Sequence, residues 1–460
     1  MSELDASYAS HPLRGVTRRA LWARMRGRRL PIVAGQLRLA GPVQRLTVTR
    51  DRWAIPHVRT REVRDAAFAL GFCQGQDRSL QLTLLRAWTR ARLSSVVGAG
   101  ALAADALALR LNLGAWSSRV LASLEPASRE LLEAFARGVE AGESLGRDAR
   151  CPGHHLLRAH PGPFSAGDAV AISVMRLLLS SLVPSGSDAS QVWGLWGLEE
   201  DSLASGRGEL AEVLRRASAA PSLPSPYYLA HLDWLSREVA GAVWVGTPLL
   251  ALGHDRNVAW WPTVGPQWLE LLGTKSESTR STLKPRRARS RRVEHLRFEP
   301  IDDAVDEVTR AIEACLFVWD RSPGPDAPCL SVGREARGGG RSEVATQSAA
   351  STHAPLARAL SLPHPVSPLR PRMAPAFSLG PLVWRDGRRE PAPLVYQLDA
   401  ADPESGRFSY PGGQSGNPLS AHYDDLVPSW LRGGGVPIVV RDSDIERLAR
   451  SRLILEPYMR

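Results

Sequence analysis

The sequence predicts an α+β protein in which a helical N-terminal half packs on a mostly antiparallel sheet. Apolar residues recur at helical spacing over much of residues 62–217. After Pro221, short runs rich in Val, Trp and Leu are bounded by Gly and Pro, as is typical of packed strands. Hydrophobic residues make up 43% and charged residues 23% of the 460 residues, which excludes whole-chain disorder, collagen-like repeats and a coiled coil.

Two strands and a long helix are predicted first. Residues 36–41 and 43–51 alternate between apolar and polar side chains, which predicts two short strands. From residue 62 to about residue 97, apolar side chains recur at helical spacing. Asp65 lies near the start of this stretch, where an acidic side chain favours the beginning of a helix.

Further helices are predicted in the rest of the first half. Residues 118–142 carry a continuous apolar stripe at helical spacing. The pattern resumes at 165–182, where Ser165 stands three residues before Asp168, the spacing of a capping box. A last helix is expected over 190–217.

The second half has a different character. Its longest apolar run, 239–253, contains Gly and Pro and is shorter than the ~20 residues of a membrane span, so it is interpreted as buried strand. Residues 257–263 predict another strand. Residues 321–392 are dominated by Pro, Ser, Gly, Arg and Ala, which predicts a flexible linker or a poorly ordered loop. The chain ends in a predicted helix-like tail over 443–454.

The chain is basic, with a net charge of +11. All but two of its cationic residues, Lys275 and Lys284, are arginine, and they are spread along the sequence. We interpret this excess as compositional bias, because a nucleic-acid footprint is concentrated on one face. The run 284–292 is able to bind phosphate through clustered arginines. No aromatic residues interleave it, so a solvated loop is the preferred interpretation.

Cysteine usage and the N-terminus suggest no covalent framework or export signal. Cys73, Cys151, Cys315 and Cys329 form no CxxC pair and no zinc-finger spacing, which argues against a metal framework and a disulfide scaffold. The arginine-rich segment 17–29 is followed by no continuous apolar core of the ~7–15 residues that a signal peptide requires. A cytoplasmic protein without a membrane span is therefore expected.

Four stretches carry recognisable motifs in chain order. They are VTRDRWAIPHV (48–58), the stretch 65–98 that contains GQDRS, LGHDRNVAWWPT (252–263) and YPGGQSGNPLS with its continuation (410–430). Together they resemble the penicillin acylase (penicillin amidase) family of N-terminal-nucleophile hydrolases, of which the chain looks like a shortened, divergent member. It departs from the family pattern at Ala54, where the family has Gly.

Most residues that match these motifs are interpreted as structural. They are Asp51, Arg52, Pro56, His57, Gln76, Asp77, Arg78, Gly253, Ala259, Trp260, Thr263, Gly413, Gln414, Ser415, Gly416 and Asn417.

Six of these motif positions have a physical interpretation. The adjacent opposite charges at 51–52 and 77–78 predict hydrogen-bonded ion pairs where chain segments meet. His57 has a possible catalytic role, but a histidine after a proline is more often a packed hydrogen-bonding group, and this is the interpretation kept. Ser415 lacks the Gly-x-Ser-x-Gly elbow of a nucleophile and is rejected as one.

The resemblance implies a truncated relative of the αββα sandwich of N-terminal-nucleophile hydrolases. The expected parts are a basic irregular N-terminus (1–34), a helical region like the family's A chain (35–220), a partial β-rich region like its B chain (221–320), a low-complexity linker or loop (321–400) and a C-terminal B-chain-like segment (401–460).

The resemblance also implies a catalytic serine that becomes the N-terminus of a second chain after self-cleavage, with its own α-amino group as base. Its usual Gly-Ser processing site is expected between residues 205 and 228, where no Gly-Ser occurs. The single Gly-Ser of the chain, Gly186-Ser187, falls within the helical half. Ser222 and Ser225 are the nearest serines and remain weak nucleophile candidates, so the catalytic residues stay unknown.

Calcium, which the family binds, is not expected here. Asp188 is a weak, vestigial candidate for one ligand, but residues 264–271 supply none of the aspartates that follow the Ala-Trp motif in the family. Too few oxygen ligands remain for an ion that takes ~6–8 of them. The oxyanion-stabilising asparagine is expected within 275–400, where no family-like segment is found. No cofactor is therefore predicted.

The resemblance implies hydrolysis of linear amide C–N bonds in N-acyl compounds, such as the acyl side chain of a β-lactam or an acyl-homoserine lactone. We expect catalysis to be lost or greatly weakened, because the nucleophile segment is missing. The alternative is a non-catalytic binding or interaction scaffold that recruits a protein partner or a second copy through unpaired strand edges. An arginine-mediated binder of nucleic acid or of an anionic surface is the weakest of the three hypotheses.

Overall fold

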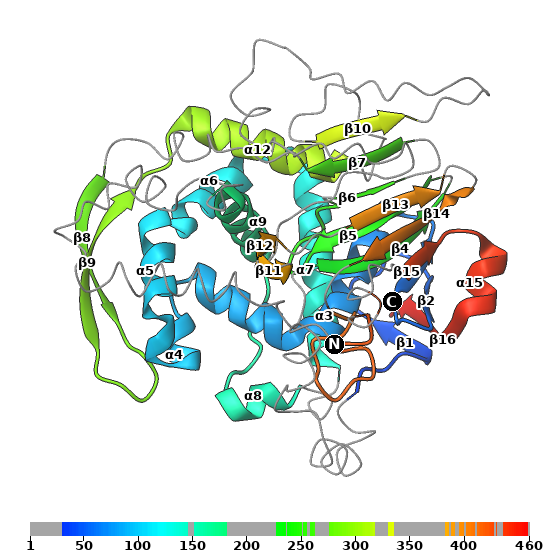
Figure 1. Ribbon diagram of the computed structural model, residues 1–460, viewed down its shortest axis with the longest axis horizontal. Coiled ribbons are helices and arrows are strands. Elements are labelled where there is room, and N and C mark those ends of the chain that lie inside the picture. The colour runs from blue at the N-terminus through cyan, green and yellow to red at the C-terminus, as the bar shows by residue number, and fades with distance from the viewer. Residues whose placement is uncertain are drawn as a thin grey trace.

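A nine-stranded mixed sheet with helices on both sides forms the body of the molecule (Figure 1). The structure is a computed structural model. It describes residues 30–145, 151–181, 227–235, 237–250, 252–254, 258–262, 276–317, 330–334, 382–385, 388–391, 395–399, 402–409, 412–426, 429 and 436–458.

Most of the described helices follow one another closely in the first half of the chain, and the last two lie in the second half. In chain order, the described helices are α3 (Val63–Thr89), α4 (Leu93–Val97), the 3₁₀ turn η1 (Ala99–Ala101), α5 (Leu102–Leu111), α6 (Leu113–Ser123), α7 (Pro126–Ser144), α8 (Pro152–Leu157), α9 (Ala166–Ser181), α12 (Asp302–Phe317) and α15 (Asp442–Leu448).

The strands come from both ends and the middle of the chain. They are β1 (Gly35–Leu39), β2 (Leu46–Asp51), β3 (Pro56–Thr60), β4 (Tyr227–Trp234), β5 (Arg237–Trp244), β6 (Leu252–His254), β7 (Val258–Pro262), β8 (Ser276–Leu283), β9 (Arg291–Phe298), β10 (Leu330–Arg334), β11 (Leu382–Arg385), β12 (Arg388–Pro391), β13 (Val395–Asp399), β14 (Asp402–Ser409), β15 (Val436–Val439) and β16 (Ala449–Pro457).

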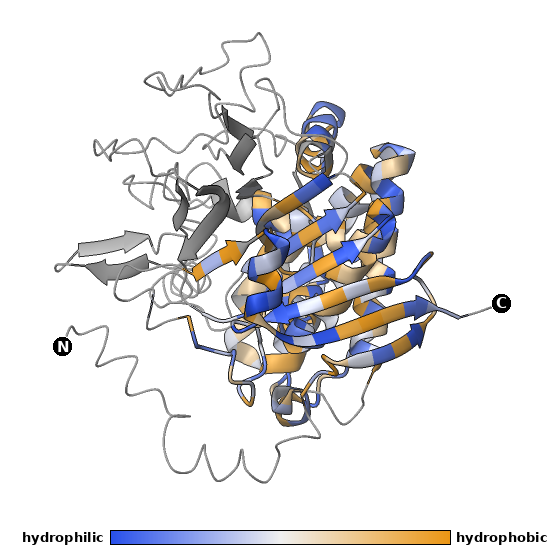
Figure 2. Ribbon diagram, turned by 90° about the vertical axis from the view of Figure 1, so that its right-hand side faces the viewer, coloured by the Kyte–Doolittle hydropathy of each residue, from blue (hydrophilic) through white to orange (hydrophobic). Residues whose placement is uncertain are grey.

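The large sheet has the order β1-β16-β2-β3-β4-β5-β6-β7-β10. The β1–β16 and β3–β4 pairs are parallel, and the other neighbours are antiparallel. Smaller sheets hold β8–β9, β11–β12 and β13–β14–β15. The predicted α+β class is confirmed. Figure 2 looks at the large sheet from the side of α15 and shows hydrophobic and hydrophilic residues mixed along its strands.

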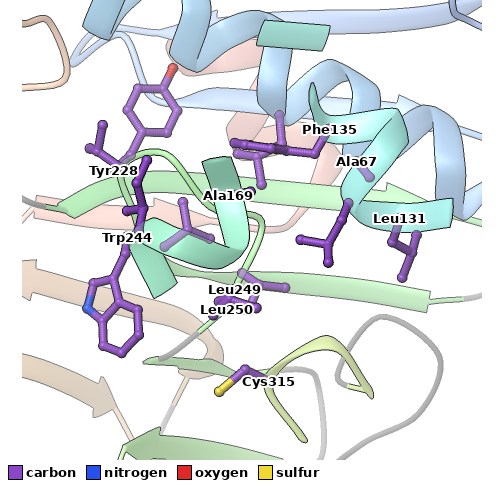
Figure 3. Close-up of a cluster of buried hydrophobic side chains, with 14 of the residues drawn as sticks. Ala67, Leu131, Phe135, Ala169, Tyr228, Trp244, Leu249, Leu250 and Cys315 are labelled. Atoms are coloured by element: carbon purple, nitrogen blue, oxygen red, sulfur yellow. The ribbon is translucent and has the colours of Figure 1, made fainter. Parts of the chain in front are cut away.

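The main core lies between the sheet and helices α3, α7 and α9 (Figure 3). Phe135 of α7, Ala169 of α9 and Tyr228 of β4 are among its fully buried side chains. On the opposite face of the sheet, α15 packs Ile445 and Leu448 against Trp53 in a small separate cluster.

Helices α3 and α7 approach each other so closely that only glycine fits at their contact. A Cβ on Gly71 would lie 2.1 Å from the Phe135 carbonyl oxygen, and one on Gly138 would lie 2.0 Å from the Phe68 carbonyl oxygen. A Cβ atom does not approach a non-bonded oxygen this closely in proteins, so Gly71 and Gly138 allow the short separation of the two helices.

Several predicted elements are confirmed with modified boundaries. The helix expected over 62–97 is split into α3 and α4, and the helix over 118–142 into α6 and α7. Ser165 and Asp168 form the predicted capping box at α9, with the Asp168 amide donating to Ser165 Oγ at 3.2 Å and the Ser165 amide donating to the Asp168 carboxylate at 2.9 Å.

The helix-like tail was a wrong prediction beyond Leu448. Residues 449–457 form β16, which pairs with β1 on one side and β2 on the other. Alternation places Leu453 and Leu455 in the core, so tertiary pairing outweighs the helical spacing of this segment.

Two other predictions fall partly or wholly outside the described residues. The helix expected over 190–217 lies outside them. Within the segment predicted as a linker, 321–392, the structure describes the short strands β10, β11 and β12.

Candidate functional site

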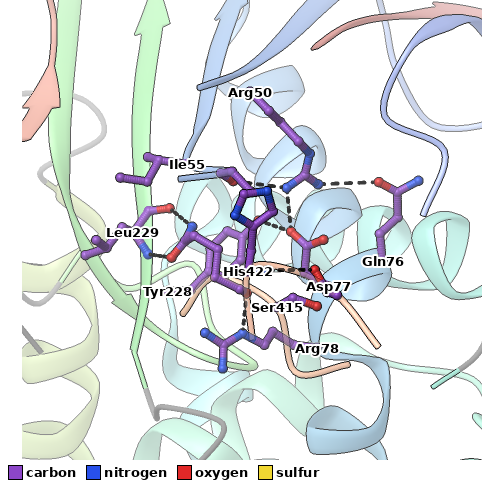
Figure 4. A network of polar contacts seen from close by, with 12 residues as sticks. Arg50, Ile55, Gln76, Asp77, Arg78, Tyr228, Leu229, Ser415 and His422 are labelled. Carbon is purple, nitrogen blue, oxygen red and sulfur yellow. Dashed lines mark hydrogen bonds and ion pairs between the residues drawn. The ribbon is translucent and has the colours of Figure 1, made fainter. Parts of the chain in front are cut away.

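A buried ion pair joins the first two sequence motifs. Arg50 at the end of β2 donates to the Asp77 carboxylate at 2.6 Å, and both side chains are only 5% exposed. Tyr228 of β4 donates its hydroxyl to the same carboxylate oxygen at 2.6 Å (Figure 4). Burial by itself lowers the pKa of Arg50, but the facing Asp77 outweighs it and holds that pKa well above the usual value. Burial and Asp77 together raise the pKa of Tyr228, which therefore stays a hydroxyl donor.

Arg78 ties α3 to the C-terminal motif. Its fully buried guanidinium donates to the carbonyls of Gly413 at 2.6 Å and Gln414 at 2.7 Å, and to that of Tyr227 at 3.2 Å. Arg78 itself has non-helical backbone angles, so α3 kinks at this point. The Asp77 carbonyl accepts a hydrogen bond from the Gly416 amide at 2.6 Å.

The Gln414 side chain forms hydrogen bonds with the backbone of Leu229 in β4, as a neighbouring strand would. Its amide oxygen accepts from the Leu229 amide at 3.0 Å, and its amide nitrogen donates to the Leu229 carbonyl at 2.6 Å. The loop 412–417 is therefore fixed to both α3 and β4. Segments distant in the sequence, 50–57, 76–78, 227–231 and 413–417, thus meet at one junction (Figure 4).

The conformation of the tight turn between β2 and β3 explains why Gly is favoured at the position of Ala54. Asp51 Oδ1 accepts from the amides of Trp53 at 2.8 Å and Ile55 at 2.9 Å. Ala54 between them has a φ of 61°, a left-handed conformation that favours Gly. The predicted ion pairing at 51–52 was wrong, because the Arg52 guanidinium stacks 3.9 Å from the Trp53 ring centroid and Arg50 pairs with Asp77 instead.

His57 belongs to a row of titratable groups that runs across β3, β4 and β5. Its Nδ1 lies 3.1 Å from Nδ1 of His231, so one ring donates and the other accepts. His231 Nε2 lies 2.8 Å from Glu238, and His57 Nε2 lies 3.8 Å from Asp51 Oδ2. Burial lowers the pKa of His57 despite the nearby Asp51 carboxylate. Burial therefore favours the neutral imidazole of His57 at neutral pH.

The two histidines lie at the floor of a pocket of about 280 Å³. The pocket lies between α15 and the sheet face formed by β2, β3, β4 and β16. Its lining residues are Arg45, Thr47, Thr49, His57, Val58, Arg59, His231, Asp233, Asp442, Ile445, Glu446, Arg452 and Ile454. These include bases and charged groups but no serine or cysteine, so this lining does not provide the nucleophile of the family.

Ser415 is bound into its own loop. Its amide donates to the His422 carbonyl at 2.9 Å, and its hydroxyl accepts from the Asn417 amide at 3.1 Å. The side chain is nearly fully buried. This arrangement gives Ser415 a structural role in the loop, in keeping with its rejection as a nucleophile.

A second serine, which the motifs did not point to, lies beside a histidine. Ser79 Oγ is 2.9 Å from His154 Nε2, and His154 Nδ1 is 2.9 Å from the Ala159 carbonyl. The carbonyl requires a proton on Nδ1, so Nε2 accepts from Ser79. The cavity lined by Ser79 holds only about 20 Å³, which is room for one water. We interpret the pair as a link between α3 and α8.

The other motif residues lie elsewhere or outside the described residues. Gly253 pairs with Trp260 across the β6–β7 hairpin, where Ala259 pairs with His254. Thr263, Asp188, Ser222 and Ser225 lie outside the described residues. Sequence reasoning did not single out Arg50, Tyr228 or His231, although Arg50 lies within the motif VTRDRWAIPHV.

The weak calcium candidate Asp188 lies outside the described residues. Among them, no group of three or more His, Cys, Asp or Glu side chains is arranged to hold a metal ion. In the same part of the chain, no helix is both long and apolar enough to cross a membrane.

Three comparisons relate the chain to known proteins. The family model described as penicillin amidase matches residues 45–269 and 268–447. The penicillin acylase 2 proenzyme of Pseudomonas sp. (strain SE83) is 35% identical over 150 residues, which are 32% of this chain and 19% of that protein. The acyl-homoserine lactone acylase QuiP of Pseudomonas putida is 28% identical over 244 residues, which are 50% of this chain and 29% of that protein.

A solved structure, a thermostable penicillin G acylase from Alcaligenes faecalis in tetragonal form, is 21% identical with a TM-score of 0.27, covering 40% of this chain and 100% of that chain. The matched part spans less than a third of the length of either curated relative. The family model, in contrast, extends over most of the 460 residues. The chain therefore belongs to the penicillin amidase family.

Proposed function

We propose that this chain derives from a hydrolase of linear amide C–N bonds in N-acyl compounds, and that it no longer catalyses the reaction. The matched relatives are named as acylases of penicillin and of acyl-homoserine lactones. These substrates share an amide between an acyl chain and a small amine. An N-acyl amide is accordingly the substrate class that the family membership supports.

The observation that carries the proposed loss is the sequence before β4. An N-terminal serine combines its hydroxyl with its own α-amino group, whose pKa near ~8 suits a base at neutral pH. Such a serine needs a cleavable bond in front of it, usually Gly-Ser. Residues 205–228, which run up to the start of β4, contain no Gly-Ser. Ser222 and Ser225 precede or neighbour prolines and are poor replacements.

The first experiment is intact-mass analysis of the purified chain, followed by an assay on a chromogenic acyl-anilide. We expect one uncut species and no turnover above that of buffer. Two fragments, the second beginning with a serine, together with turnover that is abolished by replacing that serine with alanine, would overturn the proposal. The variants Ser222→Ala and Ser225→Ala, with Ser187→Ala as a matched control, identify any serine involved.

A non-catalytic interaction scaffold is the second candidate. The junction of motifs is intact, as the Arg50–Asp77 and Arg78–Gln414 contacts demonstrate. At the edge of the described sheet, β1 pairs with β16 on one side and has no strand on its other side among the described residues. Most of its residues are exposed, and such an edge suits pairing with a second copy. Light scattering across a concentration series distinguishes a dimer from a monomer.

A further inference from the structure

The basic run singled out in the sequence forms the tip of a hairpin. Strands β8 and β9 are antiparallel. Ser276 pairs with Phe298 at one end of the hairpin, and Leu283 pairs with Arg291 at the other end. Residues 284–290 therefore make the connecting turn. Five cations in and beside this turn are exposed. They are Lys284, Arg287, Arg289, Arg291 and Arg292.

The turn is fixed to the body of the protein and differs in this respect from a free solvated loop. The Arg286 guanidinium donates to the carbonyls of Leu157 at 2.8 Å and Val96 at 3.3 Å. The Arg286 amide donates to the Ser94 carbonyl at 2.9 Å. The tip is therefore hydrogen-bonded to the ends of α4 and α8, and Figure 1 shows the hairpin beside α4.

Two large apolar side chains are exposed at these anchor points. Leu156, next to the residue whose carbonyl Arg286 binds, is 77% exposed, and Val97 at the end of α4 is 43% exposed. Arg92 before α4 and Arg158 after α8 are exposed beside them. We name these nine residues the tip patch: Arg92, Val97, Leu156, Arg158, Lys284, Arg287, Arg289, Arg291 and Arg292.

The charge of the tip patch is not neutralised locally. Within the described part of the chain, none of its cations forms an ion pair with a carboxylate. Elsewhere exposed arginines do find acids: Arg59 pairs with Asp233 and Asp442, and Arg452 with Glu446. The tip patch is thus a concentrated positive surface with apolar side chains among the cations.

We propose that the tip patch docks the protein on a bilayer surface that carries anionic headgroups. Arginines near such a surface are attracted to its negative potential, and exposed leucine and valine side chains can enter the boundary between headgroups and acyl chains. Nucleic acid is a poorer match, because no residue of the patch is aromatic and base stacking has no platform. The exposed Leu156 also adds nothing to phosphate binding.

Co-sedimentation with vesicles tests this docking, using the full chain. Vesicles of phosphatidylcholine mixed with phosphatidylserine are compared with vesicles of phosphatidylcholine alone. We expect binding to the mixed vesicles only, and a decrease in binding as salt is raised. The double variant R287Q/R289Q lowers the partition coefficient about fivefold for each arginine removed.

Matched controls separate the tip patch from net charge and from general hydrophobicity. The variant R38Q/R61Q removes the same charge from exposed arginines near β1 and β3, and it keeps its affinity for the mixed vesicles. Leu156→Ser weakens vesicle binding, whereas Leu235→Ser does not, although Leu235 is equally exposed at 77%. Circular dichroism verifies that each variant is folded.

Three results would overturn the proposal. The first is equal binding to vesicles with and without phosphatidylserine, or to neither. The second is an equal loss of affinity in R38Q/R61Q and R287Q/R289Q, which would mean that only net charge matters. The third is binding to duplex DNA that is tighter than to the mixed vesicles and insensitive to Leu156→Ser, which would assign the patch to nucleic acid.

Discussion

Arg50 of β2 and Asp77 of α3 are joined by a 2.6 Å ion pair in the interior of the protein, where both side chains are only 5% exposed. The Tyr228 hydroxyl donates to the same carboxylate oxygen from β4. One carboxylate thereby joins β2 and α3 to β4, which lies about 150 residues later in the chain. Such a pair is costly to break, because the charge left behind stays buried.

Asp77→Asn is therefore expected to destabilise the fold strongly. The substitution leaves the Arg50 guanidinium buried without its counter-charge, at a cost of ~3–5 kcal/mol in the free energy of unfolding. Denaturant unfolding followed by circular dichroism measures the loss. Glu130→Gln breaks the exposed Arg64–Glu130 pair instead, and we expect it to cost no more than ~1 kcal/mol. Equal losses in the two variants would contradict a special role of the buried pair.

The close contact of α3 and α7 gives a second prediction. Gly138→Ala places a methyl group 2.0 Å from the Phe68 carbonyl oxygen, so the helices must separate or unfold locally, and we expect a loss of at least ~1–3 kcal/mol from overpacking. Gly114→Ala is the matched control, because a Cβ there meets no atom within 4 Å. In α6 the alanine is expected to be neutral or to stabilise by ~0.4–1 kcal/mol. Thermal unfolding of both variants compares them directly.

Local periodicity was sufficient to predict α3, α9 and the first strands, because each has a buried face that repeats along its own sequence. The capping box of Ser165 and Asp168 was predictable for the same reason, since its partners are three residues apart. The strand formed by residues 449–457 was not predictable from its own sequence. Its leucines fit both a helix and a strand, and the decision comes from β1 and β2, which lie more than 390 residues earlier in the chain.

The sequence predicted that opposite charges meet at the junction, but it did not predict which residues form the ion pair. The motifs indicated that opposite charges meet there, yet Arg52 faces Trp53 and Arg50 takes the partner role. Arg50 is part of β2 whereas Arg52 follows it in the turn, so closeness in the sequence does not determine which side chain reaches a distant carboxylate. The tip patch shows the same limit, because the exposure of Leu156 beside Arg286 depends on where the hairpin rests.

The row of Asp51, His57, His231 and Glu238 predicts a pH dependence of stability. Burial lowers the folded-state pKa of His57 from its ordinary value of 6.5, so the unfolded chain binds a proton more readily than the native one. Stability is therefore complete above pH ~6.5 and is lost as the pH falls toward the folded-state pKa. Urea unfolding midpoints measured through this window are expected to fall more steeply for the original protein than for His57→Gln. Parallel curves would contradict the assignment to His57.

The thiol of Cys73 gives a prediction that needs no substitution. Burial is the main cause that raises its pKa, to about 12, with Arg50 acting in the opposite direction. The thiolate that reacts is therefore scarce at mildly alkaline pH, and the fully buried side chain is also inaccessible to the reagent, so burial protects Cys73 in two ways. In the native protein at mildly alkaline pH, we expect iodoacetamide to leave the Cys73 peptide unmodified in a mass spectrum. In guanidinium chloride the same peptide is expected to be fully alkylated, because unfolding removes both kinds of protection at once. Rapid alkylation without denaturant would mean that α3 opens far more often than its packing against α7 allows.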